Sequence, residues 1–373
     1  MYINKITGRM YLILFMVLIC LPRPIWLIAG NYINSVNNEN RTFAAKPVFN
    51  ISDYDAYSMV YTTYFNDNLP FKNELTEMNS WVNYCFFKTS ANDNVILGKQ
   101  KWLFYGNIND GDPMGNYEGK NIFTDNQMQA IQEAAVNVQN RLAEMGIELT
   151  IIVPPNKERV YKQYMPEYYE YSENSRTDML ISQLQQVNVN VINPRNELLD
   201  KQAQYPLYYS YDTHWNQLGA YVGTCEILKT WGVTTQDISE VTIVSQPLQG
   251  SYHICAEDDL AKLLNLRDSI FNDEIEYSIQ ESASIDWSEV TDDFMHIENP
   301  KAPENKKVFL LGDSYRMAML PTLSMYFSDV YVVHRDYYTY SMLEQATPDY
   351  LIIEYVERQS GLMDTLEQVV FEK

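Results

Sequence analysis

The chain has 373 residues, and its 49 aspartates and glutamates outnumber its 27 lysines and arginines, which gives a formal net charge of -22. This length is sufficient to bury one large hydrophobic core or two modest ones. The charge argues against a nucleic-acid partner, whose phosphates would be repelled, and against docking of the soluble part on an anionic membrane surface.

The first 30 residues have the pattern of a targeting segment. Lys5 and Arg9 precede an uninterrupted apolar run of twelve residues at 10–21, and a second apolar patch follows Arg23. Such a run matches the core of a signal peptide, whereas a spanning helix needs about 20 residues. Residues 10–30 reach that length only with Arg23 near their outer end. We expect an uncleaved signal anchor or, alternatively, a cleaved signal peptide with a poor cleavage site; either would send the chain from about residue 31 outside the cytoplasm.

Cysteine and histidine usage limits the metal and redox chemistry of the chain. Beyond Cys20 in the apolar run there are three cysteines, Cys85, Cys225 and Cys255, and an odd number cannot pair fully within one chain. One disulfide with a free thiol, or three free thiols, both remain open. The sequence has no C-x-x-C or H-x-x-x-H pattern and only four histidines, so we expect no metal site and no cofactor.

The segment before the predicted catalytic domain is polar and then helical. Residues 31–55 are rich in asparagine, as in a spacer next to a membrane. Residues 57–81 have helical apolar spacing that is broken at Pro70, and residues 95–106 alternate apolar and polar side chains like a hairpin. The predicted division is a signal segment at 1–30, a spacer with lead-in helices at 31–92, and a catalytic domain at 93–373.

Helices and strands alternate through the first half of the catalytic domain. An amphipathic helix is predicted over 126–146, ending at Gly146, and a strand over 148–153; a second helix over 176–186 and a short strand over 187–192 follow. This alternation predicts an α/β fold with parallel strands joined by right-handed crossovers. A further helix is predicted at 217–231.

Residues 232–305 interrupt this pattern. They hold several acidic residues, few long apolar runs and the short pattern AEDDLAKLLNL, so we interpret them as an inserted subdomain of short strands with one helix. Asp258 and Asp259 are interpreted as acidic residues in the first turn of that helix, where the dipole favours them. His253 in the same insertion is interpreted as a surface or cleft residue.

The stretch KVFLLGDSYRM at 307–317 joins a buried strand to a possible nucleophile. Gly312 permits a sharp turn, and a helix can start at Arg316 until Pro321 kinks or ends it. Ser314 would lie on this turn, beside the free backbone N–H groups of the helix start that can stabilise an oxyanion. Further strands are predicted at 329–333 and 350–355.

A serine needs a base, and the stretch YDTHWN at 211–216 offers one. His214 could take the Ser314 proton, while Asp212, two residues earlier, holds the imidazole in one tautomer and stabilises the imidazolium. The sequence therefore predicts an Asp212–His214–Ser314 triad. G-D-S and D-T-H-W are each common as turn and helix-cap sequences, and only their combination is specific.

The D-T-H-W stretch followed by the G-D-S turn resembles the SGNH-hydrolase-like domain of the alginate O-acetylation proteins AlgX and AlgJ, also called the DHHW-motif family. In that family the Asp and His precede the Ser, the reverse of ordinary SGNH esterases, and the order is the same here. The N-D-x-x-P-F turn at 66–71, the P-P-N-K turn at 154–157, the DDLAKLL segment and the E-x-x-E-R ending at 354–358 add to the resemblance over residues 46–362. Thr213 departs from the family pattern at the middle motif position.

The resemblance implies a fold, an activity and partners. The expected fold is an SGNH-hydrolase-like three-layer sandwich with a mostly parallel central sheet, permuted motif order and an inserted small subdomain. The expected activity is extracytoplasmic transfer of an acetyl group through Ser314 to hydroxyls of an exopolysaccharide or cell-wall polysaccharide, with a membrane-bound O-acyltransferase as donor partner. No separate carbohydrate-binding domain is evident after residue 362, so recognition of the polymer would fall to the cleft or to partners.

The expected substrate-binding residues flank the triad. The resemblance places the P-x-K turn near the catalytic end of the sheet, which makes Asn156 and Lys157 candidates, although a solvated lysine in a strand-ending turn is the alternative. Tyr315 and Arg316, which follow the nucleophile, are the other two candidates. Arg358 is expected to pair with a carboxylate inside the fold.

Two other functions fit the same residues. A carbohydrate esterase would use the same triad to remove acetyl groups, and the predicted anchor favours the transferase because a membrane donor has to be met close to the bilayer. A non-catalytic polysaccharide-assembly protein would hold an idle triad. In that case Ser314→Ala and His214→Ala would leave acetylation of the polymer unchanged.

Overall fold

A computed structural model describes residues 5–29, 42–49, 54–248, 257–280, 291 and 293–370. The chain divides into two compact units: Met1–Asn92 with Lys262–Asp268, and Asp93–Ala261 with Ser269–Lys373. The predictions for His253 and Cys255, and for most of the spacer, lie outside the described residues. Cys20, Cys85 and Cys225 are free thiols.

The first unit is helical. Its helices are α1 (Lys5–Cys20), α2 (Pro22–Ala29), α3 (Tyr54–Asp67), α4 (Lys72–Val82) and the π-helix η3 (Asn83–Phe87). The predicted break at Pro70 separates α3 from α4, and Phe71 adopts a left-handed conformation (φ 61°) before α4 begins. Among the described residues, no helix has both the length and the apolar character to cross a membrane.

The second unit is built on a six-stranded sheet with the order β4-β3-β10-β8-β9-β7. All neighbouring pairs are parallel except β7 with β9, so the predicted mostly parallel sheet is confirmed. A separate hairpin pairs β1 (Val95–Leu97) with β2 (Leu103–Tyr105). The strands of the large sheet are β3 (Glu148–Ile152), β4 (Val191–Ile192), β7 (Met295–Glu298), β8 (Glu304–Gly312), β9 (Phe327–His334) and β10 (Tyr350–Glu354).

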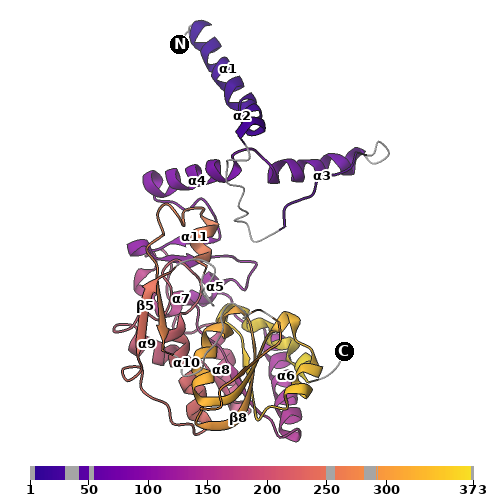
Figure 1. The fold of residues 1–373 in the computed structure, drawn as a ribbon, viewed down its shortest axis with the longest axis vertical. Helices are drawn as coiled ribbons and strands as arrows, with labels where there is room; N and C mark the ends of the chain where they lie inside the picture. Colours follow the sequence, from indigo (N-terminus) through magenta and orange to yellow (C-terminus); the bar gives the residue numbers. More distant parts are fainter. Residues whose placement is uncertain are drawn as a thin grey trace. The chain divides into compact units, whose positions relative to one another are not determined.

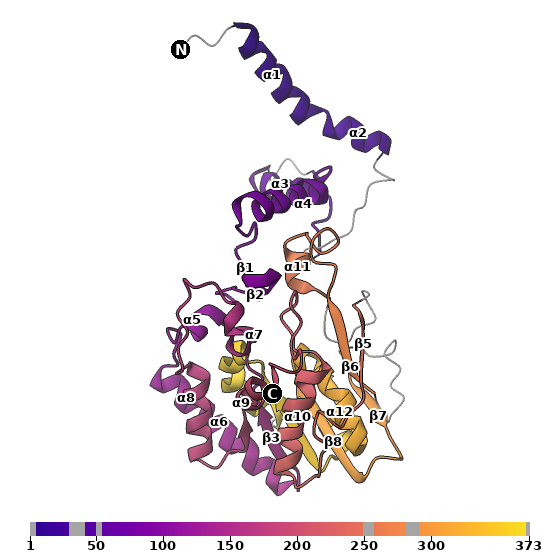
Figure 2. The same ribbon diagram turned by 90° about the vertical axis from the view of Figure 1, so that its left-hand side faces the viewer.

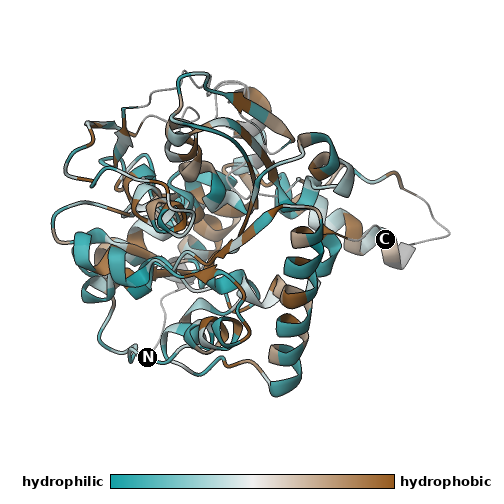
Figure 3. Ribbon diagram, turned by 90° about the horizontal axis from the view of Figure 1, so that it is seen from below, coloured by the Kyte–Doolittle hydropathy of each residue, from teal (hydrophilic) through white to brown (hydrophobic). Residues whose placement is uncertain are grey.

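Helices cover both faces of this sheet (Figures 1 and 2). The helices α6 (Asp125–Glu144) and α8 (Arg176–Gln186) lie on one face, and α10 (Gln217–Thr230) and α12 (Leu320–Tyr326) lie on the other. Alternate residues of β8 serve the two cores: Phe309 packs in the α6 and α8 layer, whereas Leu310 packs in the α10 and α12 layer. Figure 3 shows hydrophilic colours on the outer helices and hydrophobic segments toward the interior. The unit is a three-layer α/β sandwich.

The long helices begin and end where their sequences indicate. A capping box between Thr124 and Gln127 starts α6, and a second between Ser175 and Asp178 starts α8. Gly146 adopts a positive φ of 75° just after α6, the conformation that glycine adopts without a steric penalty.

Shorter elements fill the connections. Residues 232–305 contain the antiparallel pair β5 (Ile243–Pro247) and β6 (Ile275–Ile279), helix α11 (Asp259–Leu263) and the edge strand β7. The others are α5 (Pro113–Tyr117), α7 (Lys157–Val160), α9 (Arg195–Lys201), α13 (Tyr340–Ala346), η4 (Lys99–Lys101), η5 (Lys162–Tyr164), η6 (Ser314–Met319), η7 (Arg335–Tyr337) and η8 (Glu357–Val369).

Two local predictions are wrong. The strand predicted at 187–192 contains only Val191 and Ile192, because Asn188 adopts a left-handed conformation (φ 59°) in the turn that ends α8. The helix after the nucleophile begins as a 3-10 turn, and Pro321 neither kinks nor ends it. Pro321 lies in the first turn of α12, where a missing N–H removes no intrahelical hydrogen bond.

Candidate active site

Ser314 is the first residue of η6, at the carboxyl end of β8. Asp313 caps this 3-10 turn by accepting a hydrogen bond from the N–H of Tyr315 (3.0 Å), and the N–H of Arg316 donates to the Asp313 carbonyl (3.2 Å). The N–H of Ser314 has no acceptor among the described residues. The expectation that neighbouring N–H groups share an oxyanion site is therefore wrong for Tyr315 and Arg316, and Ser314 supplies the turn's free donor.

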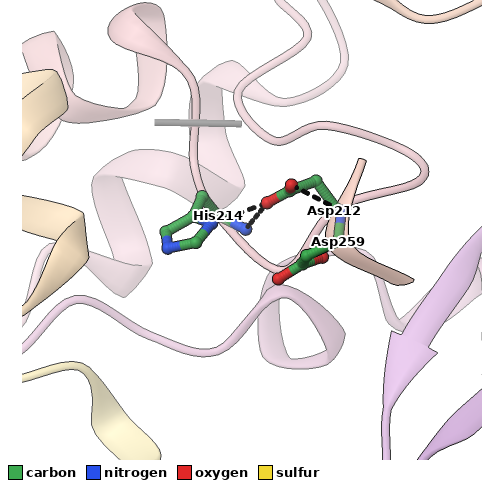
Figure 4. Close-up of side chains that lie close together, drawn as sticks. All are labelled: Asp212, His214 and Asp259. Atoms are coloured by element: carbon green, nitrogen blue, oxygen red, sulfur yellow. Dashed lines mark hydrogen bonds and ion pairs between the residues drawn. The ribbon is translucent and has the colours of Figure 1, made fainter. Parts of the chain in front are cut away.

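The loop that carries the base lies between a short bridge and α10. Tyr208 pairs with Trp215, and Asn216 caps α10 by accepting hydrogen bonds from Leu218 and Gly219. Within this loop the Asp212 Oδ1 atom accepts from the backbone N–H of His214 (2.9 Å) and lies 2.6 Å from His214 Nδ1. Figure 4 shows the Asp212 carboxylate directed at His214. The carboxylate fixes both the backbone and the ring of the base.

The two loops meet at the nucleophile. His214 Nε2 lies 2.7 Å from Ser314 Oγ, although the residues are 100 positions apart. Ser314 and the His214 ring are partly exposed, whereas Asp212 is buried. Hydroxyl, imidazole and carboxylate thus form one continuous hydrogen-bonded chain with its reactive end open to solvent, the geometry that nucleophilic catalysis by serine requires.

Electrostatics set the protonation states of this chain. Burial alone lowers the pKa of His214, but the charge and hydrogen bond of Asp212 outweigh burial and raise it above its usual value. Burial likewise raises the pKa of Asp212, and the interactions with His214 outweigh it and lower the pKa to about 2. Asp212 therefore stays ionised and favours the imidazolium that forms when His214 accepts a proton.

Asp259 supports this loop from the insertion, a role that the sequence reasoning missed. The second oxygen of Asp212 accepts hydrogen bonds from the backbone N–H groups of Glu257 (3.0 Å) and Asp259 (2.9 Å). The Asp259 carboxylate accepts from the N–H and the hydroxyl of Thr213 (2.8 and 2.6 Å). Burial and the nearby Asp212 charge raise the pKa of Asp259 to about 6. The DDLAKLL segment marked this position only as part of the family resemblance, and nothing in it indicated a contact with Thr213.

The same carboxylates bear on metal binding. Donor atoms of Asp212, His214 and Asp259 lie within 4.8 Å of one another, close enough for one cation. However, the oxygens of Asp212 accept three N–H bonds and contact the imidazole, and those of Asp259 bind Thr213. These atoms are already engaged in holding the loop, so we assign no metal to them.

Lys157 holds the base loop, and its predicted contact with substrate is corrected. Its side chain is buried, and Nζ donates to the carbonyl oxygens of Tyr209 (3.1 Å), Ser210 (3.1 Å) and Asp212 (2.6 Å). The ammonium group also lies over the ring of Trp102, 5.6 Å from its centroid. Burial lowers the pKa of Lys157 to about 8. With its three donors occupied, Lys157 acts on the chain itself.

The other three predicted substrate-binding residues, Asn156, Tyr315 and Arg316, are also buried, and their contact with substrate stays a prediction. The exposed fractions are 3% for Asn156 and 0% for Tyr315 and Arg316. The Tyr315 hydroxyl donates to the Thr213 carbonyl (2.5 Å), and Trp215 Nε1 donates to the Tyr315 carbonyl (2.9 Å). Arg316 Nη1 donates to the Asp313 carbonyl (2.8 Å). The two Tyr315 contacts join the nucleophile turn to the base loop, whereas the side-chain amide of Asn156 has no hydrogen-bond partner among the described residues.

Arg358 is close to the site. Its guanidinium lies between the rings of Tyr105 (5.5 Å) and Tyr315 (5.7 Å), and Nε is 3.5 Å from an Asp110 carboxylate oxygen. Its charge lowers the pKa of His214, an effect smaller than that of Asp212. Asp110, which is partly exposed, is thus the carboxylate that lies beside this arginine.

The sequence matches the family described as SGNH hydrolase-like domain, acetyltransferase AlgX, over residues 95–317, more than half of the chain. None of the curated proteins compared with the chain matches it. The matched region contains β1, the base loop and the nucleophile turn.

Solved structures resemble the chain at low sequence identity. Bacillus cereus PatB1 with a sulfonyl adduct is 17% identical with a TM-score of 0.53, covering 74% of this chain and 99% of PatB1. The O-acetyltransferase domain of Pseudomonas putida AlgJ is 19% identical (TM-score 0.45; 73% and 92% covered). A DHHW family protein from Eubacterium siraeum is 16% identical (TM-score 0.48; 75% and 99% covered). The likeness to PatB1 supports a shared fold.

Proposed function

The chain belongs to the AlgX family of SGNH hydrolase-like acetyltransferase domains, and from this membership we propose that it is an extracytoplasmic polysaccharide O-acetyltransferase that works through a Ser314 acyl-enzyme. The observation that carries the proposal is the pair of contacts at His214, 2.7 Å to Ser314 Oγ and 2.6 Å to Asp212 Oδ1. The apolar run at 10–21, followed by a polar stretch, supports placement outside the cytoplasm.

In the first half-reaction Ser314 Oγ attacks the carbonyl carbon of the acetyl donor, and its proton passes to His214 Nε2. The N–H of Ser314 donates to the oxyanion, and loss of one such donor typically costs about 100- to 1000-fold in rate. The tetrahedral intermediate then collapses: the bond to the leaving group breaks, and His214 returns the proton to that group. The product is acetyl-Ser314.

In the second half-reaction a sugar hydroxyl takes the place of the donor's leaving group. His214 removes the hydroxyl proton while the oxygen attacks acetyl-Ser314, and the proton returns to Ser314 Oγ as the ester bond to the enzyme breaks. The ionised Asp212 stabilises the imidazolium in both halves. The acceptor is proposed to be an exopolysaccharide or a cell-wall polysaccharide, and the donor a membrane-bound O-acyltransferase that the amino-terminal segment keeps within reach.

The test is intact mass spectrometry of the full chain after incubation with an activated acetyl ester. Wild type should gain one acetyl group, and Ser314→Ala should gain none at the same time points. Ser324→Ala is the matched control, because that serine is buried in α12 and bonded to backbone carbonyls. A second reagent, a sulfonyl fluoride, should label the same hydroxyl, in keeping with the sulfonyl adduct of PatB1.

Discharge of the acyl-enzyme separates the candidate activities. Faster loss of acetyl on adding oligosaccharide than in buffer, with the ester recovered on the sugar, supports the transferase. Loss to water alone would make the protein an esterase. Equal mass gains for wild type and Ser314→Ala with both reagents would contradict any role of Ser314 as nucleophile.

A further inference from the structure

Two acidic side chains lie together beneath the nucleophile turn. Asp313 precedes Ser314, and Glu354 is the last residue of β10, the strand that pairs in parallel with β8. Both are buried, with exposed fractions of 4% and 0%. The triad mechanism uses neither carboxyl group, so their pairing requires an explanation of its own.

Asp313 is held at both of its carboxyl oxygens. Its Oδ1 accepts from the N–H of Tyr315 (3.0 Å), its Oδ2 accepts from the N–H of Val356 (3.0 Å), and Arg335 Nη1 lies 3.8 Å from Oδ2. Through these contacts the carboxylate joins the nucleophile turn to the segment after β10.

Glu354 has the surroundings of a neutral acid. Its Oε2 accepts from the N–H of Asp313 (2.9 Å), and its Oε1 is buried without a hydrogen-bond partner among the described residues, beside the Asp313 carboxyl group. Burial, followed by the Asp313 charge, raises the pKa of Glu354 well above its usual value. A proton on Glu354 can be donated to Asp313, whereas two buried carboxylates would repel each other.

The groups that face Glu354 define what its ionisation would do. Asp313 faces it from the nucleophile turn and Arg335 from η7; Tyr355 follows it in the chain. The fit is tight, since a Cβ added at Gly312 would lie 2.5 Å from Oε2 and 2.8 Å from the Glu354 Cβ. A second negative charge would therefore act on a turn that has no room to shift without moving Ser314.

We propose that Glu354 is a positioning residue for Ser314: its carboxyl group accepts from the Asp313 N–H and so holds the nucleophile turn, and a negative charge on it would move Ser314 Oγ away from His214. The inference rests on the proposed function, because Ser314 must be the nucleophile for the effect to appear in acylation. It adds an alkaline limit that the triad alone does not contain.

The experiment measures the rate of Ser314 acylation by an activated acetyl ester against pH, using intact mass and the full chain. The first variant is Glu354→Gln: its amide oxygen can still accept from the Asp313 N–H, and its amide N–H can donate to the Asp313 carboxylate without a proton that titrates. The second variant is Glu354→Leu, which leaves the Asp313 N–H without an acceptor. Glu298→Gln is the matched control, because Glu298 also ends a strand of this sheet but is exposed. The ester's own hydrolysis is subtracted at each pH.

Wild type and Glu298→Gln should lose acylation rate at alkaline pH, whereas Glu354→Gln should keep its rate there and stay within about twofold of wild type at neutral pH. Glu354→Leu should be slower at every pH, on the order of tenfold, since a buried donor is left unpaired. An infrared band of a buried protonated carboxyl group should be present in wild type at pH 7 and absent from Glu354→Gln.

Three results would overturn the proposal. The first is an identical alkaline decline in wild type and Glu354→Gln. The second is a folded Glu354→Leu with the full rate, and the third is an infrared spectrum in which Glu354→Gln removes no band. If Glu354→Leu does not fold, the pH profiles of wild type and Glu354→Gln decide alone. Absence of acylation in wild type at every pH, with the band present, would instead identify a failure of the proposed function and remove the positioning role with it.

Discussion

Asp212 shows how much support the carboxylate beside the proposed base receives. Its two oxygens accept three backbone N–H groups and contact the imidazole, and its own carbonyl accepts from Lys157. A carboxylate held this way has one position and one charge. The ring of His214 is therefore oriented before any substrate arrives.

Asp212→Asn tests this role. The amide cannot stabilise the imidazolium, so acylation of Ser314 should fall by about 10⁴-fold. The acid limb of the pH–rate profile should also move to lower pH, because the charge that raises the pKa of His214 is gone. The measurement is the acylation rate between pH 4 and 8 (about the range in which a histidine titrates), with the exposed Asp336→Asn as control. An unchanged acid limb would assign it to another group.

Lys157→Met tests the support of the base loop. Three carbonyl oxygens would lose a charged donor, so kcat for acetyl transfer should fall on the order of tenfold or more and the unfolding free energy by about 1–3 kcal/mol, with KM little changed. Lys162→Met, in an exposed position of the same segment, should change stability by less than about 0.5 kcal/mol. A rise in KM alone would restore Lys157 as a substrate contact.

Among the elements, β8 and η6 connect the central sheet to the site. The strand ends at Gly312, and the following turn is closed by Asp313 and by the Glu354 carboxyl of the neighbouring strand. Parallel strands present their carboxyl ends at one edge, where ligands of open α/β sheets bind. Because these bonds fix the turn to β8 and β10, the position of Ser314 is set by the sheet.

Gly312→Ala should disturb this junction. The new methyl group would contact Glu354 at 2.5 Å, so we expect a loss of about 1–3 kcal/mol in the unfolding free energy and slower acylation. Gly361→Ala is the control, because its methyl group would meet only Phe123 at 3.7 Å. Denaturant unfolding followed by circular dichroism measures both. Equal stability of the two variants would mean that β10 moves aside at no cost.

The alternation of apolar and polar segments was sufficient to predict most of the elements, and the two short motifs predicted three side chains that lie within hydrogen-bonding distance of one another. The helix predicted at 176–186 from its apolar spacing has the same bounds as α8. Ser314, His214 and Asp212 were predicted from the turn and strand-end positions of their motifs, and the structure brings them together. Asp259 and Glu354 could not be identified as supports, because their partners lie 46 and 41 positions away and no local pattern encodes such contacts. Lys157 was misassigned for a related reason: a lysine after a strand is usually solvated, and only tertiary burial shows otherwise.

At the scale of the molecule, buried acids couple folding to pH. Burial raises the pKa of Glu158 to about 8, of Glu274 and Glu276 to about 7, and of Asp259 to about 6. The folded chain keeps protons on these groups that the unfolded chain has released above about pH 4.5. Their contribution to stability is complete below that pH and is lost as the pH rises through about 6 to 8.

Thermal unfolding should therefore show the highest Tm between about pH 4.5 and 6, with a decline toward pH 8.5. Below about pH 4 the Tm should fall again, because the pKa of Asp212 is lowered and its charge is needed in the fold. Circular dichroism at constant ionic strength measures this, and Glu158→Gln should flatten the alkaline decline. A Tm higher at pH 8.5 than at pH 5.5 would contradict the assignment of these acids as buried and neutral.

The inserted segment at 232–305 supports the base loop in two ways. The backbone N–H groups of Glu257 and Asp259 donate to Asp212, and the Asp259 side chain accepts from Thr213. The segment is consequently not an interchangeable module. If this segment were exchanged for that of a relative, Asp212 would lose two of its donors unless the new segment placed its backbone N–H groups at the same positions. We expect chimeras with crossovers inside this segment to lose acylation more often than chimeras that inherit it together with the base loop.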